Sequence, residues 1–297
     1  MERGRFTKRT CGTILGSAIL FAAVGGPAAA AEVDPYRDRQ WGLKKVSAAA
    51  AWKVTRGRGA LIAIVDTGVD LGHPDLRKHI ENRPGSDFVT GMTEDTAQDE
   101  NGHGTHVAGI AAALAGNGIG VAGVAPGARI LPVRVLDADG SGSAADVASG
   151  IRFAAEQGAD VINLSLGVGG AVSVTSLIGG DEAMAAAIDF AWAEGAVVVA
   201  AAGNDSLPFC SQPSGAPNIL CVGATDENDK LSLFSNSNLL SSKMNYIVAP
   251  GGSGKTCDGD ILSTMLRSAP REACTVKKGY ASLAGTSMAT PFVSGAA

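Results

Sequence analysis

The chain has 297 residues, of which 45% are hydrophobic and 18% are charged, and its formal net charge is −5. An acidic chain lacks the basic surface that binding to DNA or RNA requires, so we expect no nucleic-acid partner. The length and apolar content suit one large α/β domain.

The first 31 residues have the pattern of a secretory signal peptide. Four basic residues precede an apolar run from Cys11 to Val24, and the small residues Ala28–Ala31 predict cleavage after Ala31. The apolar run is too short for a comfortable membrane span, so we expect a secreted, extracellular protein with no membrane association after cleavage. The mature part, residues 32–297, keeps 20 of the 24 basic and 28 of the 29 acidic residues, a net charge of −8.

Beyond the signal, apolar runs alternate with amphipathic stretches, a pattern typical of βαβ units and of a parallel sheet covered on both faces. In chain order, we predict strands at Leu61–Val65, Arg129–Val135, Asp160–Leu166, Ala196–Ala201, Asn218–Val222 and Asn245–Ala249. We predict helices at His103–Ala115, Ala144–Gln157, Asp181–Glu194 and from Ser287 onward. The predicted fold class is α/β with a mainly parallel central sheet.

Polar residues lie where these predicted elements end or begin. Asp66 follows the first strand, Ser165 and Asn204 lie at the ends of two others, and His103 and Ser287 each lie at a helix start. In open α/β sheets, functional residues gather at the carboxyl ends of the strands. A serine hydroxyl is a weak nucleophile that needs an imidazole base and a carboxylate to orient that base. The sequence supplies all three groups in the order Asp, His, Ser.

Each of these residues also has a simpler interpretation. Ser287 could be a helix N-cap, and Asp66 could be a turn aspartate with Asp70 as its local competitor. His103 and His106 are three residues apart on one helix face, a spacing that could hold a metal. No glutamate lies between them as in His-Glu-x-x-His, which argues against a metalloprotease site.

Three motifs carry a resemblance to a known family: Ile64-Val65-Asp66-Thr67-Gly68, His103-Gly104-Thr105-His106-Val107-Ala108-Gly109 and Gly285-Thr286-Ser287-Met288-Ala289-Thr290-Pro291. Their order separates this chain from chymotrypsin and from α/β-hydrolases and matches subtilisin. From about Asp34 to its last residue, the chain resembles the subtilisin-like serine proteases, or subtilases, of the thermitase and bacillary-subtilisin branch. The resemblance implies a three-layer αβα fold and an endopeptidase that hydrolyses peptide bonds through an acyl-enzyme.

The same resemblance assigns roles to individual residues. It implies that Asp66, His103 and Ser287 are the catalytic triad and that Asn204 donates a hydrogen bond to the oxyanion; the simpler interpretation of Asn204 is a turn residue. It also implies that polypeptide substrates bind as an extended strand between two backbone edges. Those edges are Gly140-Ser141-Gly142 and Ser165-Leu166-Gly167.

A structural calcium ion is a further implication of the resemblance. Its ligands are the side chains of Asp34, Asp75 and Asn117 and the backbone carbonyls of Leu114, Ile119 and Val121. Carboxylate and carbonyl oxygens are the ligands that this hard cation requires. The alternative is a glycine-rich loop that binds no ion.

Four cysteines remain after signal cleavage, an even number that favours two disulfides in an exported protein. Three connectivities are possible. We favour the sequential pairing, Cys210 with Cys221 and Cys257 with Cys274, because each pair then closes a short loop. The alternative is that some of these cysteines stay as buried thiols.

Other interpretations of the sequence remain open. The stretch from Ala249 to Thr256 resembles a P-loop, but alanine replaces its first glycine and a turn with two acids follows, which argues against nucleotide binding. The chain ends ten residues after Ser287, where subtilase domains normally continue, so we expect a domain that is truncated at its C-terminus. The alternative function is a catalytically silent peptide-binding domain. We expect a monomer.

Overall fold

The computed structural model describes residues 33–89, 96–167, 182–211, 213–240, 245–268 and 274–297. The predicted signal peptide, residues 1–31, lies outside these ranges. Within them, no helix combines the length and the apolar content that crossing a membrane requires.

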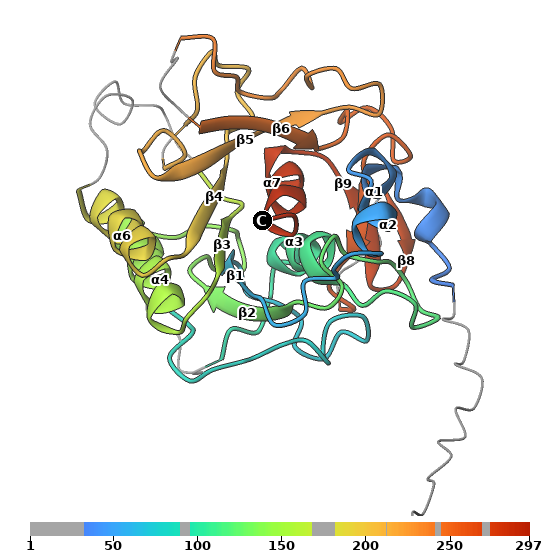
Figure 1. The fold of residues 1–297 in the computed structure, drawn as a ribbon, viewed down its shortest axis with the longest axis horizontal. Helices are drawn as coiled ribbons and strands as arrows, with labels where there is room; N and C mark the ends of the chain where they lie inside the picture. Colours follow the sequence, from blue (N-terminus) through green and yellow to red (C-terminus); the bar gives the residue numbers. More distant parts are fainter. Residues whose placement is uncertain (1–32, 90–95, 168–181, 212, 241–244, 269–273) are drawn as a thin grey trace, which may run out of the picture. The chain divides into compact units, whose positions relative to one another are not determined.

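Six parallel strands form the central sheet, in the order β2-β1-β3-β4-β5-β6 (Figure 1). Their bounds are β1 Leu61–Asp66, β2 Arg129–Arg134, β3 Val161–Leu164, β4 Val197–Ala201, β5 Ile219–Thr225 and β6 Asn245–Pro250. Each strand overlaps one of the six predicted from the apolar runs. The sheet therefore has the α/β architecture that the sequence predicts.

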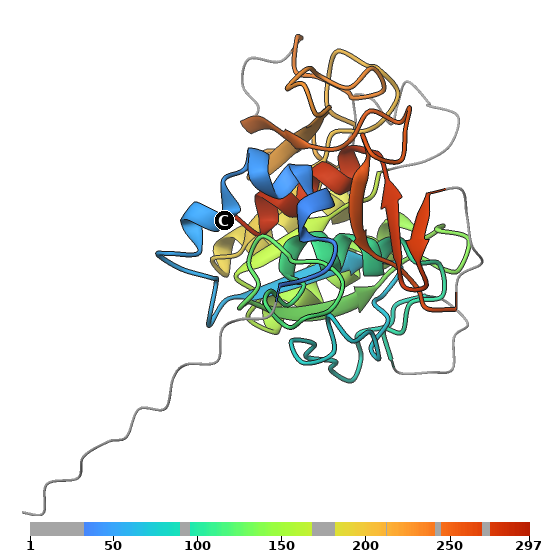
Figure 2. The same ribbon diagram turned by 90° about the vertical axis from the view of Figure 1, so that its right-hand side faces the viewer.

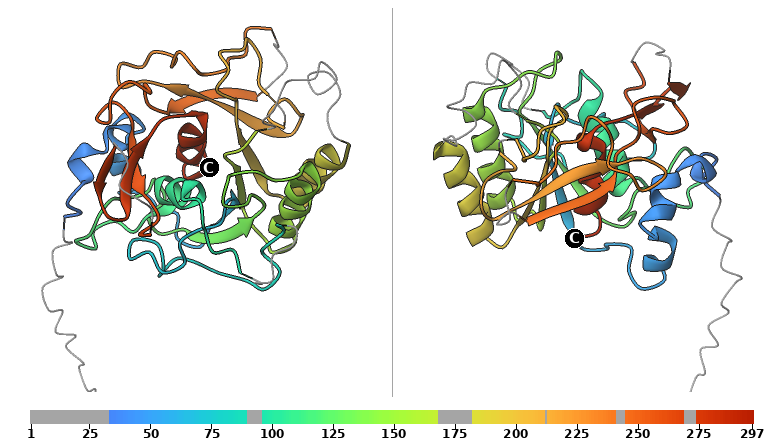
Figure 3. Two further views of the ribbon diagram at one scale, coloured as in Figure 1. Left: turned by 180° about the vertical axis from the view of Figure 1, so that it is seen from behind. Right: turned by 90° about the horizontal axis from the view of Figure 1, so that it is seen from above.

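Helices cover both faces of this sheet, as the view from above shows (Figure 3). On one face lie α4 (Ala144–Glu156) and α6 (Glu182–Ala193), and on the other lie α3 (His103–Ala112) and α7 (Thr286–Ser294). Alternate residues of β1 pack against the helices on the two faces of the sheet. Leu61, Ala63 and Val65 belong to the core cluster with α4 and α6, whereas Ile62 and Ile64 belong to the cluster with α3 and α7. This alternation explains why the strand reads as a continuous apolar run.

The ends of α4 follow from local sequence. The Ser143 side chain accepts a hydrogen bond from the Asp146 backbone N–H at 3.1 Å, and the Asp146 side chain accepts one from the Ser143 N–H at 3.3 Å. This reciprocal arrangement is a capping box. Gly158, two residues beyond the helix, has φ of +77°, the left-handed conformation in which helices commonly end.

The helix that begins at His103 ends at Ala112, three residues earlier than predicted. The carbonyls of Ile110 and Ala111 accept hydrogen bonds from the N–H groups of Val124 and Ala125, at 2.9 and 2.8 Å. A returning backbone segment thus replaces the next helical turn, which helical periodicity alone does not reveal.

Several short elements were not predicted. They are the 3-10 helix η1 (Arg37–Arg39), the helices α1 (Trp41–Lys45) and α2 (Ala48–Ala51), and the strands β7 (Ile261–Thr264), β8 (Thr275–Lys277) and β9 (Tyr280–Leu283). The three strands form an antiparallel sheet in the order β7-β9-β8, seen from the side in Figure 2. β7 packs against α3, and β9 leads into α7. This small sheet therefore joins the helix of His103 to the helix of Ser287.

Candidate active site

The predicted catalytic residues come together at the carboxyl edge of the central sheet. Asp66 is the last residue of β1, His103 is the first residue of α3, and Ser287 lies in the first turn of α7. A cavity of about 450 Å³ lies beside them. Its lining includes Thr67, Asn101, His103, Leu136, Gly140, Ser141, Gly142, Ser165, Leu166, Gly167, Pro213 and Ser287.

Asp66 and His103 form a direct hydrogen-bonded pair. The His103 Nδ1 atom lies 2.8 Å from Asp66 Oδ1, and this carboxylate oxygen also accepts the Thr67 N–H at 2.8 Å. Asp66 is fully buried, whereas the His103 side chain is 28% exposed. Because Nδ1–H donates to the carboxylate, the neutral ring keeps Nε2 as its free basic nitrogen.

The pKa of His103 stands above its ordinary value. Burial lowers this pKa, but the charge of Asp66 and its hydrogen bond, with a contribution from the charge of Asp99, more than offset the effect of burial. An opposite charge within hydrogen-bond distance favours the protonated ring. The ring is therefore a stronger base than an isolated imidazole.

Side chains outside the helix fix the N-terminus of α3. The Asn101 side chain accepts the His103 N–H at 3.1 Å, Thr67 Oγ1 accepts the Gly104 N–H at 2.9 Å, and Asp99 Oδ2 accepts the Thr105 N–H at 2.9 Å. These groups satisfy donors that a helix leaves unpaired in its first turn. They therefore set the direction in which His103 leaves the backbone.

Asp99 is a site residue that the sequence analysis missed. It is buried and accepts five hydrogen bonds, from the Thr67 hydroxyl, the N–H groups of Asn101 and Gly102, and both the N–H and the hydroxyl of Thr105. Burial nevertheless raises its pKa. An acidic residue just before a predicted helix is favourable at the positive helix end, and that signal could have identified it.

Ser287 forms a reciprocal pair with Ser165. The Ser287 hydroxyl donates to the Ser165 carbonyl at 3.1 Å, and the Ser165 hydroxyl donates to the Ser287 carbonyl at 2.8 Å. The Ser287 carbonyl is available because residue 291, four positions later in α7, is a proline and has no N–H. Within the described ranges, Ser287 makes no hydrogen bond to His103, so its side chain must rotate before the two can exchange a proton.

Asn204 presents its amide nitrogen to the same region. Its Oδ1 atom accepts hydrogen bonds from the Thr286 N–H at 2.9 Å and the Thr286 hydroxyl at 3.0 Å, which fixes the orientation of the amide. A Cβ atom on Gly285 would lie 3.6 Å from both Asn204 Nδ2 and the Ser287 backbone nitrogen. Both nitrogen atoms therefore lie near one point, which the absence of a side chain on Gly285 leaves unfilled.

The two predicted substrate edges lie on different elements around the cavity. Gly140, Ser141 and Gly142 belong to the exposed loop between β2 and α4, and Ser165, Leu166 and Gly167 follow β3. Asp137 organises the first edge, because its Oδ1 atom accepts the N–H groups of Asp139 and Ser141 at 2.9 Å. All six residues line the cavity from which His103 and Ser287 are reached.

His106 does not face the cavity. It is buried in α3, and its Nε2 atom lies 3.1 Å from the Ala281 carbonyl of β9. Burial lowers its pKa to about 3, so the ring is neutral and donates this bond through Nε2–H. His106 thus connects α3 to the small sheet.

The predicted calcium ligands lie around the buried carboxylates of Asp34 and Asp75. The Asp75 carboxylate accepts hydrogen bonds from Asn117 Nδ2 at 2.8 Å and the Val121 N–H at 3.0 Å. Asp34 accepts the Gly116 and Asn117 N–H groups. Of the other two ligands, Leu114 donates its N–H to the Asp75 carbonyl and Ile119 donates its N–H to Asn117 Oδ1.

The charges at this loop suit a cation. Burial raises the pKa of Asp75, against the hydrogen bonds that lower it, and the charge of Asp34 adds to the rise. Neither carboxylate forms a salt bridge with a described residue. Two buried carboxylates that form no salt bridge among the described residues supply the kind of oxygen ligands that a hard divalent ion takes.

The P-loop-like stretch has a different structure from a nucleotide site. After β6, residues 251–260 form turns that lead to β7, and no helix begins at Lys255. The Gly254 N–H donates to Asp260 Oδ1 at 2.8 Å, so this loop N–H group is already bonded to a carboxylate. These residues belong to the connection before the small sheet.

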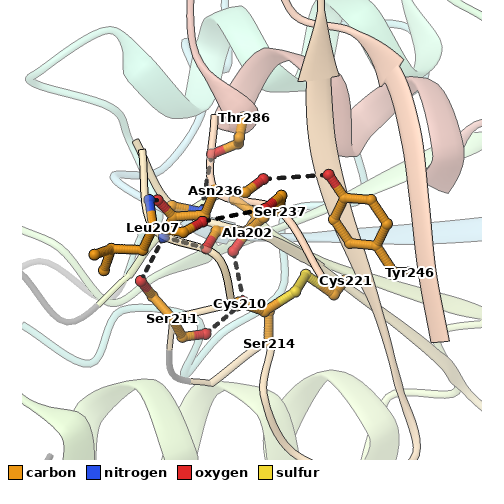
Figure 4. The surroundings of a disulfide bond; sticks show 12 residues. Ala202, Leu207, Cys210, Ser211, Ser214, Cys221, Asn236, Ser237, Tyr246 and Thr286 are labelled. Atoms are coloured by element: carbon orange, nitrogen blue, oxygen red, sulfur yellow. Dashed lines mark hydrogen bonds between the residues drawn. A yellow bond between two sulfur atoms is a disulfide. The ribbon is translucent and has the colours of Figure 1, made fainter. Parts of the chain in front are cut away.

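The structure contains two disulfides, Cys210–Cys221 and Cys257–Cys274, the sequential pairing that the sequence analysis favoured. The first joins the loop after β4 to β5 and is surrounded by hydrogen-bonded serines and asparagine (Figure 4). Cys221 is fully buried, next to Ala202 and Cys210. This bridge therefore ties the loop that carries Asn204 to β5.

Removing the Cys210–Cys221 bridge should reduce stability. We expect the double variant Cys210→Ala/Cys221→Ala to lose about 2–4 kcal/mol of unfolding free energy, since the crosslink restricts the unfolded chain. Denaturant unfolding of both proteins under non-reducing conditions measures the difference. Peptide mapping of the unreduced native protein is the check on pairing, and four alkylatable thiols there would contradict it.

A family model described as the subtilase family matches residues 57–297. Thermitase of Thermoactinomyces vulgaris is 46% identical over 265 residues, covering 89% of this chain and 83% of thermitase. Subtilisin Savinase of Lederbergia lenta is 42% identical over 258 residues, covering 86% of this chain and 82% of Savinase.

Two further relatives differ in coverage. The thermophilic serine proteinase of Bacillus sp. strain AK1 is 42% identical over 263 residues, which are 88% of this chain but 57% of that protein. A solved structure of a protease from Pseudoalteromonas arctica PAMC 21717 superposes with a TM-score of 0.73 at 30% identity, covering 89% of this chain and 85% of that chain.

Proposed function

Because the chain belongs to the subtilase family and is a serine endopeptidase, we propose that Asp66, His103 and Ser287 form its catalytic triad. The observation that carries this proposal is the 2.8 Å hydrogen bond between Asp66 and His103, beside a cavity that Ser287 also lines. Asp66 holds the ring with Nε2 toward the nucleophile and stabilises the imidazolium that forms during the reaction.

The first half of the reaction forms the acyl-enzyme. After rotation away from the Ser165 carbonyl, the Ser287 hydroxyl gives its proton to His103 Nε2 while its oxygen attacks the carbonyl carbon of the scissile peptide bond. The tetrahedral intermediate then collapses, the carbon–nitrogen bond breaks, and His103 returns the proton to the leaving amine. In the second half, water attacks the ester in the same way and releases the acid.

The negative oxygen of the tetrahedral intermediate needs fixed donors. We propose that Asn204 Nδ2 and the Ser287 N–H supply them, since both nitrogen atoms lie 3.6 Å from the point that a Cβ atom on Gly285 would occupy. The two hydrogen bonds from Thr286 to Asn204 Oδ1 support this role. They fix the amide, which then does not have to reorient as negative charge develops on the substrate oxygen.

Polypeptide substrates are proposed to lie as an extended strand between Gly140–Gly142 and Ser165–Gly167. Two of the first three residues and one of the second three are glycines, which allow a second backbone to approach closely.

We further propose that the protein is secreted as a monomer after removal of residues 1–31. The basic and apolar pattern of that segment and the two disulfides of the domain support export.

Covalent labelling tests the proposed nucleophile. A serine-reactive phosphonate should form one adduct, which mass spectrometry of the digested protein should locate on Ser287. A saturating peptide substrate should slow the labelling, since both compete for one cavity. Loss of peptide cleavage through labelling of another serine, or cleavage that continues in protein fully labelled at Ser287, would contradict the assignment.

Calcium is proposed as a structural ion of this enzyme. Asp34, Asp75 and Asn117 would hold it through side chains, and Leu114, Ile119 and Val121 through backbone carbonyls. When bound, the ion supplies positive charge between two buried carboxylates. Asp34 lies near the start of the described chain and Asp75 after β1, so the ion would join distant segments.

Chelation should lower the melting temperature. An ion present at 100 times its Kd stabilises the folded state by about 2.7 kcal/mol, which corresponds to roughly 5–10 °C for a domain of this size. Thermal unfolding in excess calcium and in chelator measures the shift. Asp75→Asn should reduce it, whereas Asp258→Asn, at an 89% exposed carboxylate, should not. Identical melting curves in both conditions would exclude the site.

A further inference from the structure

Asn236 is a fully buried amide in the segment between β5 and β6. Its Nδ2 atom donates to the Ala202 carbonyl and to the Ser211 hydroxyl, both at 2.9 Å. Its Oδ1 atom accepts the Asp205 N–H at 3.0 Å and the Leu207 N–H at 2.9 Å. All four hydrogen-bonding positions of this side chain are therefore used, and all four partners lie in the loop after β4. Figure 4 shows three of them, Ala202, Leu207 and Ser211, around Asn236.

These bonds bracket Asn204. Asn236 contacts Ala202 on one side and Asp205 on the other, and its own backbone N–H donates to the Gly203 carbonyl at 2.9 Å. Gly203 has φ of +106°, and a Cβ atom there would lie 2.4 Å from Asn236 Nδ2. The backbone next to Asn204 therefore packs directly against Asn236.

The Asn204 side chain is held from a second direction. Thr286 donates two hydrogen bonds to Asn204 Oδ1, and its hydroxyl accepts the Gly203 N–H at 3.2 Å. Asn204 itself is exposed, so packing does not fix it. Its amide nitrogen keeps its direction only if the backbone at 202–205 and the contact with Thr286 are both in place.

We infer that Asn236 is a positioning residue that aims the amide of Asn204 at the oxyanion. This inference rests on the proposed role of Asn204. Replacing Asn236 with alanine removes four hydrogen bonds to the loop but no group that touches substrate. We expect the misplaced donor to lower kcat by about 30- to 100-fold, since small displacements of a catalytic group can cost ~10²-fold. The KM value should stay within about twofold, because the proposed substrate edges lie on other segments.

A double-mutant cycle separates this role from a purely structural one. The kcat and KM values of one chromogenic peptide are measured for Asn204→Ala, Asn236→Ala and the double variant. If Asn236 acts through Asn204, Asn236→Ala should lower kcat by less than about threefold once Asn204 is already alanine. Ser232→Ala is the control, since it removes a buried 2.6 Å hydrogen bond to the Gly252 carbonyl from the same β5–β6 segment. It should leave kcat unchanged.

The remaining outcomes of this cycle contradict either the inference about Asn236 or the proposed role of Asn204. An equal loss of kcat from Asn236→Ala in both backgrounds, or no loss in the parent enzyme, overturns the inference. An active Asn204→Ala variant with unchanged kcat instead overturns the proposed oxyanion role. If Asn236→Ala does not fold, Asn236→Ser, which keeps one hydroxyl partner for the loop, takes its place in the same cycle and is judged by the same criterion.

Discussion

Replacing Ser287 with alanine should lower kcat for peptide hydrolysis by about 10⁶-fold, the size of the loss known for the triad serine of subtilisin. The variant keeps the cavity and its backbone donors but has no oxygen that can form the acyl-enzyme. The fold should persist, because the lost hydrogen bond to the Ser165 carbonyl contributes only about 1 kcal/mol. Single-turnover assays and thermal unfolding measure the two effects separately.

Two controls define this result. His103→Ala should lose nearly as much activity, because members of a triad act as a unit. Ser149→Ala, in which an exposed α4 serine loses its bond to the Ala145 carbonyl, should keep full activity. A folded and inactive His106→Ala variant together with an active His103→Ala variant would show that the base has been assigned to the wrong histidine.

Replacing Asp66 with asparagine should lower kcat by about 10⁴-fold, since an amide no longer selects the productive tautomer of the histidine. The pH profile should also move. His103 works as a base only when neutral, so kcat/KM rises as pH increases through its pKa. The Asp66 charge and hydrogen bond raise that pKa against the effect of burial. Without them, the residual activity should appear at a lower pH than in the parent enzyme.

Asp70→Asn is the matched control for this prediction, because Asp70 is the other carboxylate close behind β1. It is bound to Arg267, with oxygen–nitrogen distances of 2.8 and 3.0 Å. The variant should retain the activity and the acidic limb of the parent profile. An unchanged acidic limb in Asp66→Asn would show that another group controls the protonation of His103.

Most of the central sheet could be predicted because its strands, apart from the partly exposed β6, are buried on both faces and read as continuous apolar runs. Leu61–Val65 is an example, since each residue enters one of the two cores. The small sheet could not be predicted in this way. β8 has three residues and β9 has four, too short for a periodic signal, and they form strands because they pair with β7 beside α3.

The candidate site also contains some residues that could be predicted from the sequence and others that could not. Motifs predicted Asp66, His103, Asn204 and Ser287, because the resemblance to the family rests on the residue types at these positions. The residues that hold them were missed. Asn236 follows Leu-Ser-Leu-Phe-Ser, which has no special pattern, and the role inferred for it comes from contacts around Asn204, 32 positions earlier in the chain. Long-range hydrogen bonds of this kind leave no mark in local periodicity.

The proline inside α7 has a structural consequence at the site. Because Pro291 offers no N–H, the Ser287 carbonyl is free for the Ser165 hydroxyl, and the Ser165 carbonyl receives the Ser287 hydroxyl in return. The proposed nucleophile and the start of a proposed substrate edge are thus bonded directly to each other in both directions. Ser165 is also held by Asn163 of β3, whose Nδ2 atom donates to the Ser165 hydroxyl at 2.9 Å. These hydrogen bonds connect α7, the proposed substrate edge and the end of a central strand through one residue.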